Sequence, residues 1–313
     1  MSLLENVNSV TKLAENNEVQ LMVFKTGMDK DAPFYAINVF KTREAIESKK
    51  HFLTQIPSSH PLLEGTINLR GSLVPIIDLP AWLNIPLTKE EKKLSKILIC
   101  DFNGVMIGLR ISMAHKIVKK SWGDLHAPDG YAISDESKVV NDTRLDDGSI
   151  CLVLDYEKLL AEVIPEAMVD AENNYQITAS NIPARLSQGT VLIAEDSRTA
   201  QKALTRIFSN AEVPMRIFPN GRLLLEYVDS LPNPEASIPA IVTDLEMPEV
   251  SGFKVVMTLK ANNSTRNIPV IINSSMTGTS NKRDAQKLGA DGFISKTKSD
   301  KIIPLIISLM GDS

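Results

Sequence analysis

Cysteines, long apolar runs and clustered basic residues are all scarce in this sequence of 313 residues. The two cysteines, Cys100 and Cys151, each lie in an apolar run (ILICDF and SICLVLD). We therefore expect buried, reduced thiols, although the sequence leaves open whether the two are close enough to form a disulfide. No stretch of about 20 apolar residues occurs, so no membrane-spanning helix is predicted.

Targeting and nucleic-acid signals are also missing. The first residues, MSLLENVNSV, lack the basic and apolar regions of a signal peptide, so we expect a cytoplasmic protein. The formal net charge is -4, and lysine pairs such as Lys49-Lys50 are scattered among acids. Because phosphate backbones require a concentrated basic face, nucleic acid is not an expected partner.

The first half of the chain carries no catalytic pattern. Its four histidines lack the spacing of metal ligands, and it contains neither a glycine-rich phosphate loop nor a nucleophile elbow. We therefore expect a binding module there and no enzyme.

The pattern along the chain predicts two domains, in line with a prior of about 150 residues per domain. Residues 1–165 are rich in short apolar runs typical of strands, and residues 166–188 form a polar, asparagine-rich linker. Residues 189–313 alternate between strand-like and helix-like segments.

Short strands dominate the prediction for residues 1–165. Runs rich in Val, Ile and Phe recur between turn signals, which is typical of a β-sandwich or barrel. The Asn-Gly pair at 103–104 predicts a tight hairpin. Helices are expected only near 3–14, 79–84 and 155–163.

Residues 189–313 are predicted to form five strands alternating with five helices, beginning with VLIAED and ending in a helix through Met310. This order implies a parallel sheet with helices on both faces. In such a sheet, ligands bind beyond the carboxyl ends of the strands.

The residues at those strand ends predict phosphoryl chemistry. Glu195-Asp196 follows the first strand, Asp244 the third, Ser274 lies at the end of the fourth, and Lys296 follows the fifth. Clustered carboxylates require a compensating cation, and oxygen ligands suit Mg²⁺. A carboxylate nucleophile with a lysine and a hydroxyl beside it fits autocatalytic phosphorylation of one aspartate, whereas any single acid could instead cap a helix.

Residues 189–313 also resemble a response-regulator receiver domain, the doubly wound, flavodoxin-like fold of CheY. The resemblance is carried by Ala-Glu-Asp at 194–196, Asp-Leu-Glu-Met-Pro at 244–248, Gly252, Pro-Val-Ile-Ile-Asn-Ser at 269–274 and Gly-Phe-Ile-Ser-Lys at 292–296. It implies that Asp244 is the phosphoacceptor. The implied Mg²⁺ ligands are Glu195, Asp196, Asp244 and the Glu246 backbone carbonyl. Ser274 is the implied switch hydroxyl, Phe293 the switch aromatic and Lys296 the phosphate-binding lysine. Thr297 departs from the family, which usually has proline there.

Residues 16–165 resemble the adaptor CheW, whose fold is a pair of five-stranded, SH3-like barrels. The strongest match is LLEGTINLRGSLVPIIDLPAWLNIP at 62–86, supported by FYAINVFKTREAI at 34–46 and ICLVLDYEKLL at 150–160. The resemblance implies binding to chemoreceptors and the histidine kinase CheA, with Arg70, Glu44 and Thr42 at the interface. An alternative for Arg70 is an internal bond that holds its own turn.

An adaptor fused to a receiver resembles the CheV-type coupling proteins of bacterial chemotaxis. The resemblance implies a cytoplasmic, non-enzymatic adaptor that is associated with receptor arrays and controlled by phosphorylation from CheA. One alternative is that the receiver only drains phosphoryl groups from CheA, and another is that it is inert.

Overall fold

The computed structural model describes residues 16–29, 31–56, 60–85, 87–102, 104–126, 137–165, 182–275 and 279–311, with only the backbone described at 279–281 and 311. The chain divides into two compact units. One is built from residues 19–120 and 124–168, and the other chiefly from residues 169–313.

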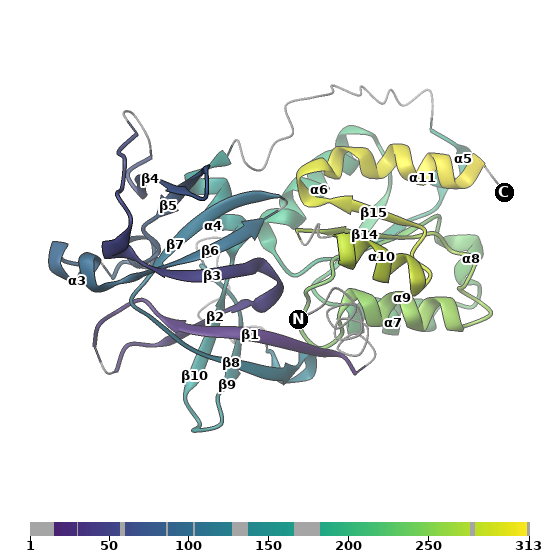
Figure 1. The fold of residues 1–313 in the computed structure, drawn as a ribbon. Coiled ribbons are helices and arrows are strands. Elements are labelled where there is room, and N and C mark those ends of the chain that lie inside the picture. The colour runs from purple at the N-terminus through teal and green to yellow at the C-terminus, as the bar shows by residue number, and fades with distance from the viewer. Residues whose placement is uncertain are drawn as a thin grey trace. The chain divides into compact units, whose positions relative to one another are not determined.

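The first unit is all-β and contains two five-stranded sheets (Figure 1). The order in one sheet is β8-β1-β2-β10-β9, and the order in the other is β3-β6-β7-β5-β4. The strands of the first sheet are β1 (Glu18–Lys25), β2 (Phe34–Asn38), β8 (Met113–Ser121), β9 (Val139–Arg144) and β10 (Ile150–Leu154). Those of the second are β3 (Thr42–Glu47), β4 (Leu63–Leu69), β5 (Ser72–Ile77), β6 (Lys96–Phe102) and β7 (Val105–Ile111).

Both sheets curl so that their outer strands are joined. The segment after β3 bridges to β4 through Thr54 and Thr66, and the segment after β8 bridges to β9 through His126 and Asp142. Such closure removes open sheet edges and produces small barrels. This architecture confirms the predicted pair of five-stranded barrels.

Short helices connect the strands, and side chains cap their first turns. Asp78 accepts from the Ala81 amide at the start of α2 (Leu79–Trp82), and Asp155 accepts from the Lys158 amide at the start of α4 (Tyr156–Val163). Thr88 and Glu91 form a reciprocal capping box at α3 (Lys89–Leu94). Two 3₁₀ segments complete the unit, η1 (Val39–Lys41) and η2 (Ser48–Lys50). A further 3₁₀ segment, η3 (Trp122–Asp124), follows β8.

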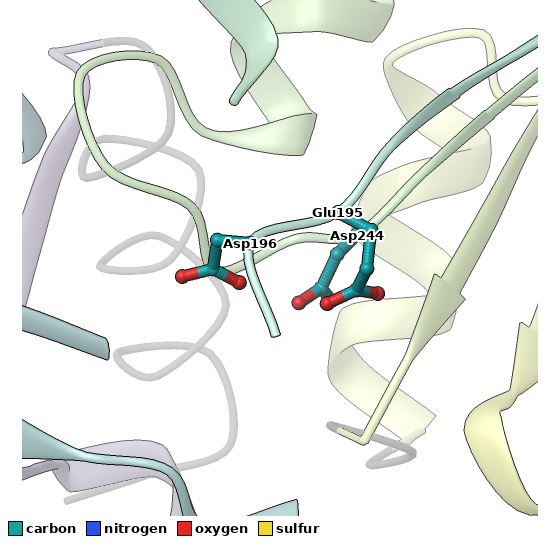
Figure 2. Close-up of side chains that lie close together, drawn as sticks. All are labelled: Glu195, Asp196 and Asp244. Carbon is teal, nitrogen blue, oxygen red and sulfur yellow. The ribbon is translucent and has the colours of Figure 1, made fainter. Parts of the chain in front are cut away.

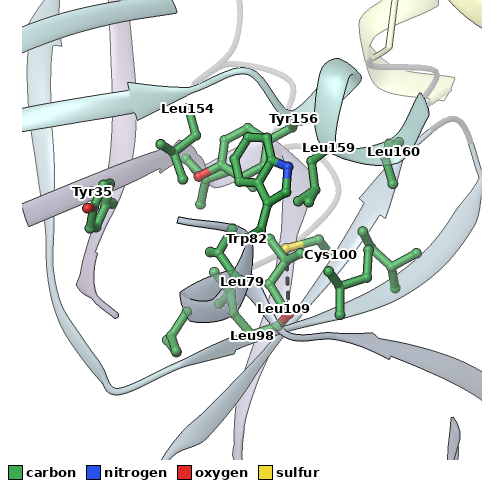
Figure 3. Packing of buried hydrophobic residues seen from close by; sticks show 14 of the residues in the cluster. Tyr35, Leu79, Trp82, Leu98, Cys100, Leu109, Leu154, Tyr156, Leu159 and Leu160 are labelled. Atoms are coloured by element: carbon green, nitrogen blue, oxygen red, sulfur yellow. Dashed lines mark hydrogen bonds between the residues drawn. The ribbon is translucent and has the colours of Figure 1, made fainter. Parts of the chain in front are cut away.

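One apolar core serves both barrels (Figure 3). It takes Tyr35 from the first sheet, Leu98 from the second, Trp82 from α2 and Tyr156 from α4, all at most 5% exposed. The Tyr156 hydroxyl donates to the Ala36 carbonyl (2.9 Å), so this buried phenol keeps a hydrogen bond. The shared core explains why the two barrels form one compact unit.

The second unit is a parallel five-stranded sheet of order β12-β11-β13-β14-β15, in which every neighbouring pair runs in the same direction. Helices α6 and α11 lie on one face, with α7 and α9 on the other (Figure 1). Its strands are β11 (Val191–Ala194), β12 (Met215–Phe218), β13 (Ile241–Thr243), β14 (Val270–Ser274) and β15 (Gly292–Ser295). Its helices are α5 (Ala184–Gln188), α6 (Arg198–Asn210), α7 (Gly221–Asp229), α8 (Pro234–Ser237), α9 (Gly252–Ala261), α10 (Thr279–Lys287), the 3₁₀ segment η7 (Lys296–Lys301) and α11 (Ile302–Gly311).

The sheet is buried on both faces, as its apolar strands predict. Residues of β11, β13 and β14 such as Ile193, Val242 and Ile271 are at most 1% exposed and pack with α6 and α11. The doubly wound fold predicted from the alternation of strands and helices is therefore confirmed. None of the helices in the described part of the chain has the length and apolar character needed to cross a bilayer.

Some elements agree with the sequence prediction and others differ. The predicted hairpin between β6 and β7 is present, with Phe102 opposite Val105 and Gly104 at a positive φ of 84°. The prediction missed β3, β9, α3, α5 and α8. The helix predicted near residues 3–14 lies outside the described residues.

Candidate functional site

Three carboxylates meet at the carboxyl edge of the parallel sheet (Figure 2). Ala194, the last residue of β11, is level with Thr243, the last residue of β13, so Glu195 and Asp244 follow adjacent strands at the same height. Oxygen atoms of Glu195, Asp196 and Asp244 all lie within 4.8 Å of one another. Glu195 is 1% exposed and Asp244 4% exposed, so two of the three charges are nearly removed from water.

Lys296 supplies a positive charge inside this cluster. It follows β15, and its ammonium lies 2.8 Å from Oε2 of Glu195 and 3.0 Å from Oδ2 of Asp244. The side chain is 4% exposed. Lys296 contacts two of the three carboxylates, and carboxylates held this close together favour a bound cation.

Backbone and neighbouring side chains hold the two buried acids in place. Ser197, the N-cap of α6, donates its amide to Oε1 of Glu195 (3.0 Å), and Gln201 donates to the Glu195 carbonyl (2.6 Å). Asp244 receives the Leu245 amide at Oδ1 (2.6 Å). Neither Ser197 nor Gln201 was predicted from the sequence, although a serine directly before an amphipathic helix is a recognisable cap.

Gly252 is required by the close approach of α9 to the strand end that carries Asp244. A Cβ atom at this position would lie 1.9 Å from the Asp244 carbonyl oxygen, well inside any permitted contact. Gly252 was recognised in the sequence only as part of a motif, and the structure supplies its physical reason. Any larger residue there would displace Asp244 or α9.

The remaining predicted residues lie at or near the same edge. Ser274 ends β14, is completely buried and is level with Ser295 on β15, one residue before Lys296. Phe293 is half-buried on β15, and Glu246 is half-buried in the loop two residues after Asp244. The sheet therefore gathers onto one edge the strand ends that carry the predicted acids, hydroxyl and lysine.

A second group of predicted residues lies on the first unit. Arg70 occupies the turn between β4 and β5 with a positive φ of 53°, and its side chain is 79% exposed. Its guanidinium pairs with Glu44 on β3 at 2.9 Å. The turn itself is bridged by Asn68, whose Oδ1 accepts from the Gly71 amide (2.9 Å). The guanidinium of Arg70 thus contacts a neighbouring strand, while Asn68 holds the turn.

Thr42 lies on the same strand as Glu44, but its hydroxyl is used locally. It donates to the Val39 carbonyl (2.8 Å) and so closes the 3₁₀ turn η1. The pairing of β3 with β6 is irregular between Thr42 and Glu44. The structure therefore brings Arg70 and Glu44 into direct contact, whereas Thr42 contributes to the end of the strand.

The cysteines are both free and buried, as expected from the sequence. Burial raises the pKa of the Cys151 thiol to about 12 and raises the pKa of Cys100 as well. Because the thiolate is the reactive form, neither residue is a nucleophile at neutral pH.

Comparison with known proteins agrees with both halves of this description. The CheW-like domain model matches residues 20–163, and the response regulator receiver domain model matches residues 191–307. Among single proteins, chemotaxis protein CheW of Thermotoga maritima is 27% identical over 116 residues, covering 37% of this chain and 74% of that protein.

Two relatives match almost the whole chain. Chemotaxis protein CheV2 of Helicobacter pylori is 34% identical over 304 residues, covering 94% of this chain and 96% of that protein. Chemotaxis protein CheV1 of the same organism is 36% identical over 312 residues, covering 96% of this chain and 95% of that protein. The chain is therefore a chemotaxis adaptor with a receiver domain and belongs to the family of CheV proteins.

Proposed function

We propose that this protein couples chemoreceptors to the histidine kinase CheA and that a phosphoryl group on Asp244 controls the coupling. The observation that carries the proposal is the contact of Lys296 with both Asp244 and Glu195 at a buried strand edge. A nucleophilic carboxylate and a fixed ammonium are the protein groups that phosphoryl transfer to aspartate requires.

The proposed reaction starts from a phosphohistidine of CheA. An Asp244 carboxylate oxygen forms the new O–P bond while the N–P bond breaks, and the electrons of that bond return to the imidazole, which takes up a proton. Lys296 then lies beside the transferred group and balances its charge. The Ser274 hydroxyl donates to a phosphoryl oxygen. The half-buried side chain of Phe293 then changes its position in response to the shift of Ser274.

The acidic cluster fits Mg²⁺, because its ligands are oxygen atoms of clustered carboxylates. Glu195, Asp196, Asp244 and the backbone carbonyl of Glu246 would hold the ion. When bound, it would supply positive charge to the phosphoryl oxygens. The close approach of the three carboxylates, with oxygen atoms within 4.8 Å of one another, supports this assignment.

Exposed Arg70 and its partner Glu44 form the proposed contact surface for receptor or kinase, with Thr42 at its border. A guanidinium that projects into solvent can form several hydrogen bonds with a partner helix.

We place the adaptor at residues 1–165, the linker at 166–188 and the receiver at 189–313. The protein would be a cytoplasmic adaptor at receptor arrays that catalyses only its own phosphorylation and dephosphorylation.

Two measurements test the proposal. Purified CheA carrying labelled phosphate should transfer it to the wild-type protein but not to an Asp244→Ala variant. In a reconstituted assay with receptor and CheA, kinase output should differ between the phosphorylated protein and Asp244→Ala. Equal output would instead support a phosphate sink, and no transfer to the wild type would support an inert receiver.

A further inference from the structure

A buried asparagine interrupts an apolar strand directly beside the acidic cluster. Asn273 is 1% exposed and follows Ile271 and Ile272, which are both fully buried in β14. An amide in such a position costs free energy unless its polar atoms are hydrogen-bonded. An apolar side chain of similar size would carry no such cost, so the hydrogen-bond partners of Asn273 indicate what the amide does.

Those partners lie on the segment that carries Lys296. The Asn273 amide nitrogen donates to the Ile294 carbonyl on β15 (3.3 Å). Its carbonyl oxygen lies 3.2 Å from the hydroxyl of Ser299, the third residue after Lys296. Asn273 itself directly precedes Ser274 in the sequence. The amide therefore joins the end of β14 to a residue that precedes Lys296 in the sequence and to a residue that follows it.

Ser299 completes the connection to the backbone of Lys296. Its hydroxyl lies 2.9 Å from the Lys296 carbonyl oxygen as well as 3.2 Å from Asn273, and the residue is 8% exposed. A hydroxyl has one proton, so the two acceptors share it. The Lys296 carbonyl is thus linked, through the Ser299 hydroxyl, to the Asn273 side chain on the neighbouring strand.

The turn after Lys296 has a second, local support. Ser295 caps the 3₁₀ segment η7 and accepts from the Thr297 amide (3.3 Å), and the two hydroxyls of Ser295 and Thr297 lie 2.8 Å apart. These contacts fix the turn but do not connect it to β14. The side chains of Asn273 and Ser299 connect the turn to the strand of Ser274, in addition to the backbone pairing of β14 with β15, which reaches Ser274 and Ser295.

We propose that Asn273 and Ser299 are positioning residues for Lys296. They hold the lysine backbone at a fixed place relative to β14, so that the ammonium reaches Asp244 while Ser274 remains level with the same phosphoryl group. The hydrogen bonds of the two side chains in the described part of the chain go to the Ile294 and Lys296 carbonyls and to each other, so their effect passes through Lys296. The phosphorylation part of this proposal rests on the function proposed above, whereas the positioning part does not.

The test uses the full-length Ser299→Ala variant and two readouts. The first is the rate at which a lysine-specific acylating reagent labels Lys296, followed by mass spectrometry without phosphodonor. The second is the rate of phosphorylation by acetyl phosphate with Mg²⁺. Ser308→Ala is the matched control, because the Ser308 hydroxyl donates to the Leu305 carbonyl (2.8 Å) in α11 away from the site. Ser299→Thr retains a hydroxyl and should rescue both readouts.

We expect Ser299→Ala to raise Lys296 labelling severalfold and to slow phosphorylation about tenfold, since small displacements of a charged group reduce rates strongly. The control should change neither readout. In a Lys296→Ala background, Ser299→Ala should slow phosphorylation no further, because its effect passes through the lysine.

Three results would overturn the proposal. Lys296 labelling unchanged by Ser299→Ala would show that the serine does not position the lysine, whatever happens to phosphorylation. An equal loss of rate in the Lys296→Ala background would show that the serine acts independently. Failure of Ser299→Thr to rescue labelling would exclude the hydroxyl as the cause. Absence of phosphorylation in the wild type would count against the proposed function, while the labelling result would still decide the positioning.

Discussion

The ammonium of Lys296 lies 3.0 Å from Oδ2 of Asp244, although the two residues are 52 positions apart in the sequence. Both residues follow strands of the parallel sheet, and both side chains are 4% exposed. Burial screens this contact less than water would, and the contact ties two strand ends that are not neighbours in the sheet. The consequences of this ion pair for stability and for metal binding can be measured.

Removal of the ammonium should destabilise the receiver at neutral pH. In Lys296→Ala, the buried carboxylates of Glu195 and Asp244 would lose their shared positive partner, which we expect to cost about 3 kcal/mol of unfolding free energy. Urea unfolding of the receiver transition in EDTA measures this cost. Mg²⁺ should restore part of the loss. Lys282→Ala, at an exposed position of α10, is the control, and an equal loss in both variants would contradict the prediction.

The exposed arginine of the adaptor should matter for binding and little for stability. We expect Arg70→Ala to weaken binding to purified receptor or CheA at least tenfold, because exposed arginines with several donors are frequent interface anchors. Its surface ion pair with Glu44 should contribute less than about 1 kcal/mol to stability. Calorimetric titration and thermal unfolding measure the two quantities.

The adaptor offers a matched control for that experiment. Arg43 also lies on the outer surface and forms an ion pair, with Asp101 at 2.6 Å and with its side chain 55% exposed. Arg43→Ala should leave binding unchanged. If both variants weakened binding equally, general surface charge and not Arg70 would be responsible.

A buried arginine of the adaptor, in contrast to Arg70, should matter for stability. Arg110 is 3% exposed, pairs with Glu64, and donates to the hydroxyls of Ser48 and Ser95 (2.9 and 2.5 Å). Arg110→Ala would leave Glu64 with only Lys92 as a counter-charge (2.6 Å) among the described residues and would open a cavity. We expect a loss of about 3 kcal/mol in the unfolding of the adaptor, measured with urea. A loss below about 1 kcal/mol would contradict the structural role.

Asp284 on α10 should destabilise the receiver at neutral pH. It is 1% exposed, and neither carboxylate oxygen has a hydrogen-bond partner among the described residues, although Lys287 lies 3.6 Å away. Burial raises the pKa of Asp284 above its ordinary value, an effect that Lys287 and Arg283 partly oppose. The protonated form is therefore favoured in the folded state, and the ionised form is penalised.

The raised pKa of Asp284 in the folded state determines how the stability of the receiver changes with pH. The stability associated with the neutral form is fully present below the unfolded pKa of about 4 and is lost as the pH rises through the raised folded value. Asp284→Asn, which stays neutral, should thus gain about 1 kcal/mol at pH 7.5 and gain nothing near pH 4. Urea unfolding at both pH values checks this, with exposed Asp229→Asn as control. A gain that does not depend on pH would contradict the explanation.

Local pattern predicted most of the receiver and less of the adaptor. Alternating apolar strands and amphipathic helices have a clear period, and parallel sheets bring their strand ends to one edge. In contrast, β3 (TREAIE) and β9 (VVNDTR) are polar and lack a continuous apolar run. They become strands because β6 and β10 pair with them. The short helix α3 was missed even though Thr88 and Glu91 carry the capping-box spacing.

The residues that meet at the strand edge could be predicted from the sequence alone. Glu195, Asp244 and Lys296 each come directly after an apolar strand. Because a parallel sheet brings the carboxyl ends of its strands to one edge, these three residues are expected to lie there. The individual contacts between atoms, in contrast, emerged only from the three-dimensional structure. Examples are the ion pair of Arg70 with Glu44 and the hydrogen bond between Asn273 and Ser299, which join separate segments. The burial of Asp284 likewise depends on packing between elements. Local periodicity carries no information about such contacts, because they depend on how separately formed elements pack.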